Sequence, residues 1–174
     1  MKKLKLMFVL LLGIISVVGC GKSPKEDAEM AEATPLGIMT KIEELLSESY
    51  DIPLEDGQLS GYVLTDMKNT EEMFMYEDIF NTEDIESGYI LQHLMNVRSE
   101  LIIVAEAKNA ESAKNIQAAY EKVLSNQEET WSHYLEDQYQ LVKENKIVTQ
   151  GNYVLYATSE KVDEIVKLFE ETVK

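Results

Sequence analysis

The chain has 174 residues, about the size of one ordinary domain. Its 32 acidic residues outnumber the 16 basic ones, so the formal net charge at pH 7 is −16. A surface of this charge repels nucleic acid phosphates and anionic lipid headgroups alike, which excludes DNA or RNA binding as a function.

The N-terminus has the plan of an export signal. A basic start precedes an apolar run over residues 6–18, and small residues follow. The run is shorter than the roughly 20 residues that a membrane-spanning helix needs. Val17-Val18-Gly19-Cys20 predicts cleavage between Gly19 and Cys20, as in bacterial lipoprotein precursors, which this segment resembles. Residues 1–19 are then a lipoprotein signal peptide.

Cys20 is the only cysteine of the chain, so the exported protein forms no internal disulfide. The resemblance to lipoprotein precursors implies a diacylglycerol thioether on Cys20. Two acyl chains hold a protein stably at a membrane, whereas one chain holds it reversibly. We therefore expect an extracytoplasmic protein, anchored to the outer face of the cell membrane. Residues 20–34 are expected to form the lipidated N-terminus and an acidic linker, which acts as a flexible tether.

A single domain is expected over residues 35–174. Pro35 suits a first helical position, and apolar residues recur at helical spacing up to about Ser49. Residues 51–69 are expected to form a loop with a short strand near 62–64. Thr70 is expected to start a short helix that ends near Ile79. Residues 88–95 and 101–105 then predict two adjacent strands.

The second half of the chain predicts a long helix, a looser helical segment, a hairpin and a last helix. Asn109 caps a long helix whose apolar stripe is interrupted only by Gln127, and a looser helical segment follows over 137–143. Gly151-Asn152 predicts a tight turn between two strands, and Ser159 is expected to cap the last helix. This order predicts an α+β fold: a small antiparallel sheet of about four strands with helices packed on one face.

Residues 95–155 carry the pieces of a family pattern. They are Met95-Asn-Val, Glu100-Leu-Ile-Ile-Val, Trp131-x-x-Tyr134 and Gly151-Asn-Tyr-Val. With the leader, they resemble the uncharacterised bacterial lipoproteins grouped as domain of unknown function 4358. The resemblance implies a surface lipoprotein with no assigned activity, and it transfers no catalytic residue.

The sequence carries no recognisable catalytic constellation, and we expect a protein that is not an enzyme and needs no cofactor. His133 falls off the stripe of the long helix and is expected in solvent, whereas His93 is expected to be partly buried in a strand. The motifs of serine hydrolases, zinc proteases and phosphate-binding loops are absent from the sequence. Residues 51–57 fail as a calcium loop, because Pro53 stands at a ligand position, so no metal site is assigned.

Met73, Phe74, Met75 and Tyr76 form an apolar run that exceeds what one helix face can bury. Core filling is the simpler interpretation, and a surface for a protein partner is the alternative, because methionine adapts to varied contacts. The sequence thus favours a non-catalytic binding domain at the cell envelope, held at the membrane through Cys20, with an envelope protein as a possible kind of partner. The alternative function is a cation-dependent ligand-binding module that uses acidic clusters.

Overall fold

The computed structural model describes residues 33–69, 71–76 and 78–174. The signal peptide, Gly19, Cys20, nearly all of the expected linker and Thr70 lie outside the described residues. The helices are α2 (Pro35–Tyr50), the short 3-10 helix η1 (Glu72–Met75), α3 (Ala110–Trp131), α4 (Glu136–Lys143) and α5 (Val162–Thr172). Within the described part of the chain, no helix combines the length and the apolar character needed to cross a bilayer.

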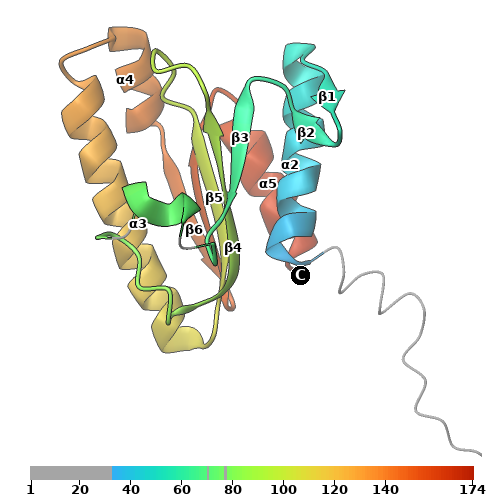
Figure 1. Ribbon diagram of the computed structural model, residues 1–174, viewed down its shortest axis with the longest axis vertical. Coiled ribbons are helices and arrows are strands. Elements are labelled where there is room, and N and C mark those ends of the chain that lie inside the picture. Colours follow the sequence, from blue (N-terminus) through green and yellow to red (C-terminus); the bar gives the residue numbers. More distant parts are fainter. Residues whose placement is uncertain (1–32, 70, 77) are drawn as a thin grey trace, which may run out of the picture.

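The centre of the molecule is a five-stranded antiparallel sheet in the order β3-β4-β5-β7-β6 (Figure 1). Its strands are β3 (Tyr62–Asp66), β4 (Ile85–His93), β5 (Leu101–Ala107), β6 (Lys146–Gln150) and β7 (Tyr153–Thr158). A separate small hairpin consists of β1 (Leu54–Glu55) and β2 (Gln58–Leu59). In β5 every residue except Glu106 is buried, as expected for a central strand.

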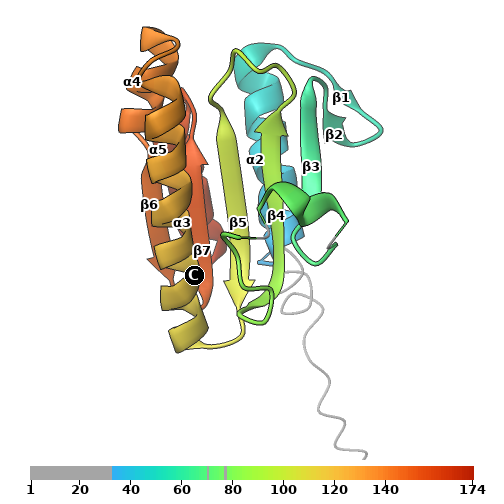
Figure 2. The ribbon, with the colours of Figure 1, turned by 60° about the vertical axis from the view of Figure 1, so that its left-hand side comes forward.

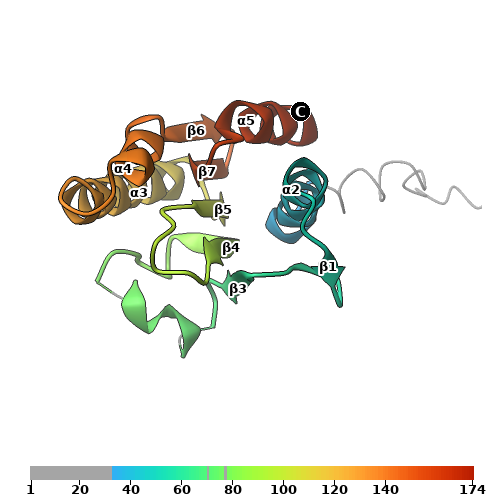
Figure 3. The same cartoon turned by 90° about the horizontal axis from the view of Figure 1, so that it is seen from above.

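Helices cover both faces of this sheet, which is clearest when it is seen from above (Figure 3). One face carries α2 and α5, and the other carries α3 together with the segment around η1. The sheet therefore separates two apolar cores. Residues that alternate along β5 contribute to each in turn, since Ile103 belongs to the α3 side and Val104 to the side of α2 and α5.

The expected α+β class and the antiparallel sheet are confirmed, and the structure differs from the expectation in two details. The main sheet has five strands rather than about four, because all of residues 62–66 pair with β4. The helices lie on two faces rather than one. The physical reason is the continuous apolar run of β5, which has buried side chains on both faces and so needs cover on both.

The ends of the elements follow local rules with one shift. Thr34 caps α2 by accepting a hydrogen bond from the Gly37 N–H at 3.1 Å, and Gly151 takes the positive φ of 59° that the predicted hairpin turn needs. The last helix begins at Val162, later than expected. Ser159 Oγ accepts from the Lys161 N–H at 3.1 Å, so Ser159 shapes the turn before α5 rather than capping the helix itself.

Candidate functional site

A cavity of about 420 Å³ lies where the loop between β4 and β5 meets the last turns of α3. We call it the hairpin pocket. Its volume falls in the range of small-ligand sites. The wall is built from the segment after η1, the end of β4, the connecting loop and α3, through Tyr76, Ile79, Gln92, His93, Leu94, Met95, Asn96, Arg98, Ser99, Glu100, Leu101, Val123, Asn126, Gln127, Thr130 and Trp131.

The rim of the pocket is aliphatic and unusually exposed. Leu94 is 66% exposed and Met95 57%, and Tyr134, also 57% exposed, packs its ring on Trp131 with 5.8 Å between centroids. The backbone of the loop fixes these positions, because the Leu94 N–H donates to the Gly61 carbonyl at 2.9 Å and the Met95 N–H donates to His93 Nδ1 at 3.0 Å. The most exposed large apolar side chains in the described part of the chain therefore gather at this end.

The polar floor of the pocket is organised by Gln127. Its Nε2 donates to the Ser99 carbonyl at 2.9 Å, while Tyr156 and Thr158 donate their hydroxyls to its Oε1 at 2.7 and 2.9 Å. This network explains the one interruption in the apolar stripe of α3. The sequence marks Gln127 as an exception, but it does not reveal the partners, which lie 28 or more residues away.

Ser99 ties the loop to α4 as well. Its N–H donates to Gln138 Oε1 at 2.9 Å, and its hydroxyl donates to the Gln138 carbonyl at 3.1 Å. Both residues are buried, so these bonds lie away from competing water. The pocket wall is thus held at the same time from α3, from α4 and from the sheet.

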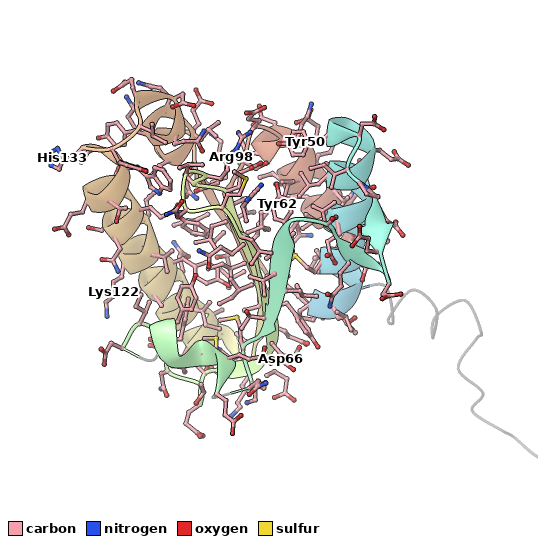
Figure 4. All side chains as sticks on the ribbon, turned by 45° about the horizontal axis from the view of Figure 1, so that its top comes forward. Tyr50, Tyr62, Asp66, Arg98, Lys122 and His133 are labelled. Carbon is pink, nitrogen blue, oxygen red and sulfur yellow. The ribbon has the colours of Figure 1, made fainter. Side chains whose placement is uncertain are left out.

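In the wall of the pocket, Glu100 is a buried carboxylate, and each of its two oxygens accepts a hydrogen bond. It is 7% exposed, and it accepts hydrogen bonds from the Tyr50 hydroxyl at 3.1 Å and the Tyr62 hydroxyl at 3.2 Å. Burial, together with the charge of Glu100, raises the pKa of both tyrosines far above the ordinary value. The hydroxyls therefore stay protonated donors. Since Tyr50 ends α2 and Tyr62 begins β3 (Figure 4), their bonds to Glu100 join the end of α2 to the sheet.

The histidines lie as the sequence predicts. His93 is half-buried, with its ring 4.6 Å from that of Tyr62, and burial lowers its pKa. Its Nδ1 is already occupied by the Met95 N–H. His133 is exposed (Figure 4). Among the residues that the structure describes, neither histidine hydrogen-bonds to a hydroxyl that could act as a nucleophile.

Metal ligands do not gather in the described ranges. No group of three or more His, Cys, Asp or Glu residues there lies close enough to hold a metal ion. The cation-dependent alternative therefore has no candidate set of ligands among residues 33–69, 71–76 and 78–174.

The apolar run at 73–76 is divided between core and pocket. Met73 is 3% exposed and belongs to the core on the α3 side. Tyr76 is half-buried, packs against that core and donates its hydroxyl to Gln92 Oε1 at 3.0 Å in the pocket wall. Burial raises the pKa of Tyr76 to about 12. The side chains of Phe74 and Met75 lie outside the description, so the expected partner patch stays a prediction there.

Comparison with known proteins adds one match. A family model described as Domain of unknown function (DUF4358) matches residues 60–159. The matched range runs from just before β3 to just after β7, so it includes every residue that lines the hairpin pocket and omits α2 and α5. No curated protein and no solved structure matches the chain.

Proposed function

Since the chain belongs to the DUF4358 family, whose description carries no activity, we propose its function from its own residues: it is a lipid-anchored, extracytoplasmic binding domain that captures a partner in the hairpin pocket. The observation that carries this proposal is a 420 Å³ cavity with an exposed aliphatic rim. Solvent-exposed apolar side chains beside a cavity are typical of binding sites, because a partner that covers them removes apolar surface from water.

The position of the pocket suits a protein held by its N-terminus. Helix α2 runs from Pro35 to Tyr50, a rise of about 24 Å for 16 residues, and Tyr50 contacts Glu100 beside the pocket. The first turn of α2 therefore lies at the end of the molecule opposite the β4–β5 loop (Figures 1 and 2). A lipid on Cys20 would place the pocket away from the membrane, where a partner outside the cell can reach it.

The chemistry of the pocket supports binding rather than catalysis. Ser159, which contacts the Tyr50 hydroxyl at 3.3 Å, is 2% exposed, so no substrate reaches its side chain without opening the fold. The carboxylate of Glu100 already accepts from two tyrosines. Groups that are buried and already hydrogen-bonded in this way hold a structure together, whereas a general base needs access to the proton that it removes.

Site-specific crosslinking in cells that make the full chain tests the proposal. A photo-reactive amino acid replaces Met95 on the rim or, as the control, Leu54 in β1, which is 39% exposed outside the pocket. We expect one distinct adduct at Met95, its loss when Leu94→Ser is added, and no such adduct at Leu54. Equal adducts at both positions, or none at Met95 in a protein present at the normal level, would contradict the binding role.

A further inference from the structure

The chemistry of the pocket wall points to a class of ligand. We infer that the hairpin pocket binds the C-terminal end of a short apolar peptide, with its terminal carboxylate at Arg98. The inference rests on the proposed function, namely that the pocket is a binding site. It goes further by fixing the charge, the polarity and the size of the occupant.

Arg98 provides the wall with a binding group for an anion. Arg98 is the sole Lys or Arg among the described lining residues, and Glu100 is the sole acidic one. Both oxygens of Glu100 accept from tyrosines, whereas Arg98 has no carboxylate of the described residues within salt-bridge distance. The wall thus offers a cation without a carboxylate partner, beside a carboxylate whose two oxygens already accept hydrogen bonds. A guanidinium binds a carboxylate through two parallel hydrogen bonds, so a terminal carboxylate is its natural partner.

Asp137 competes for Arg98 from outside the pocket. Hydrogen bonds from Gln138 lower the pKa of Asp137, and the positive charge of Arg98 contributes to the same shift. The two side chains are therefore within electrostatic reach, although they form no ion pair. More distant acidic residues are largely screened at physiological salt, where the Debye length is about 8 Å. The net negative charge of the chain thus weakens the attraction of an anion to Arg98 without cancelling it.

Polar groups in the wall match a peptide backbone. The Nε2 of Gln92 and the side-chain amides of Asn96 and Asn126 form no hydrogen bond with any described residue. All three residues line the pocket. A peptide offers carbonyl and N–H groups to such amides, whereas a fatty acid would cover them without pairing. The pocket also lies at the end of the domain opposite the start of α2 (Figure 1), so with the proposed anchor on Cys20 a ligand from outside the cell reaches it more readily than a lipid of the same membrane.

The apolar wall and the volume limit the length of the peptide. Leu94, Met95, Val123 and Trp131 offer aliphatic and aromatic surface to an apolar side chain. A volume of about 420 Å³ is at the lower part of the range for small-ligand sites. The last two or three residues of a chain therefore enter the pocket, with the terminal carboxylate at Arg98.

Trp131 provides a direct readout, because it is the only tryptophan of the chain and lies in the pocket wall, 7% exposed. The purified full-length mature protein is titrated with N-acetyl-Ala-Leu-Leu, with its C-terminal amide and with octanoate, while the emission of Trp131 is recorded. We expect the free acid to bind about tenfold more tightly than the amide, which corresponds to one charge-assisted contact. Octanoate is expected to bind more weakly than the peptide acid.

Variants separate the role of Arg98 from general charge. Arg98→Gln is expected to remove the preference for the free acid, and Arg98→Lys to retain part of it. Asp137→Asn is expected to tighten binding of the acid about two- to fivefold, the scale of an exposed charge pair. Lys122→Gln is the matched control, since Lys122 is exposed on α3 outside the pocket and lies far from Arg98 (Figure 4).

Three binding results would overturn the inference: equal binding of the acid and the amide, octanoate binding as tight as that of the peptide acid, or no change in Trp131 emission with any peptide. A fourth is a protein that sediments as a dimer and whose Trp131 emission changes with protein concentration. The last would mean that a second copy fills the pocket. If Met95 still gives its adduct in cells, the proposed binding function survives each of these results. If that adduct is missing too, both proposals fail.

Discussion

At the scale of single residues, Gln127 is the polar residue that interrupts the apolar stripe of α3, and it is the centre of a buried hydrogen-bond network. Its side chain satisfies the hydroxyls of Tyr156 and Thr158, both 0% exposed, and holds the loop through the Ser99 carbonyl. The sequence identifies the exception because the spacing of α3 is otherwise regular. It could not identify the function of the exception, because the partners are joined only by the fold.

We predict that Gln127→Leu lowers the free energy of unfolding by about 2 to 4 kcal/mol, because two buried hydroxyls lose their acceptor. Urea denaturation at neutral pH measures the loss. Gln117→Leu on the exposed side of the same helix is the control: it removes only an exposed hydrogen bond from the Thr149 hydroxyl and should change stability by no more than about 0.5 kcal/mol. Similar losses for the two variants would show that the network contributes little.

Glu43 adds a pH dependence to the fold. It lies on α2, is 2% exposed, and accepts the Leu59 N–H at 3.0 Å. Burial raises the pKa of its carboxyl, and the bond from Leu59 offsets only part of that rise. The folded protein therefore holds this proton more tightly than the unfolded chain does. Its contribution to stability is present below the ordinary value of 4.5 and is lost as the pH rises through the folded pKa.

Glu43→Gln keeps an oxygen for the Leu59 N–H and removes the buried charge. We expect it to raise the free energy of unfolding at pH 7, with a smaller gain near pH 4, where the Glu43 carboxyl of the unchanged protein is largely protonated in both the folded and the unfolded state. Urea titrations at the two pH values measure the difference, and Glu44→Gln at the exposed neighbouring position is the control. A gain independent of pH, or a loss at pH 7, would contradict this account of Glu43.

At the scale of elements, the sequence predicts that a strand or helix exists more reliably than it predicts the residues where the element begins and ends. The run in β5 and the helix capped by Asn109 are confirmed close to the expected bounds. Strand β4 begins at Ile85, three residues before the expected Gly88. The expectation was wrong because a glycine in the sequence is typical of the boundary of a strand. In the structure Gly88 lies inside the strand, where a Cβ would come within 2.7 Å of the Met67 sulfur.

We predict that Gly88→Ala lowers the free energy of unfolding by about 1 to 3 kcal/mol, because the new methyl group crowds Met67 and the backbone of β5. A double-mutant cycle with Met67→Ala, measured in urea, should show coupling, with the pair costing less than the sum of the single changes. Strict additivity would mean that the close approach of Met67 does not set the need for glycine at this position.

At the scale of the whole molecule, the sequence indicates where the protein acts more readily than what it binds. The leader and Cys20 are contiguous, so a short motif suffices to predict the anchor. The hairpin pocket is different, since its wall joins residues from 76 to 131 that meet only after the sheet and α3 have packed. Arg98 and Trp131 carried no signal of a shared site in the sequence.

The two cores share one sheet, so we predict that the fold is lost in a single step. In the Cys20→Ala protein, which is free of lipid, the urea transitions followed by Trp131 fluorescence and by far-UV circular dichroism should coincide. Trp131 reports the face of α3, whereas circular dichroism reports all elements. A fluorescence transition at clearly lower urea would show that the pocket side unfolds independently of α2 and α5.

The anchored placement of the pocket is the centre of the proposed function, and the intact mass of the protein extracted from membranes tests it most directly. We predict a polypeptide that begins at Cys20 and carries a diacylglycerol on its sulfur, while Cys20→Ala leaves the membrane fraction. A bare thiol on the exported chain, or a product that still contains residues 1–19, would contradict the account.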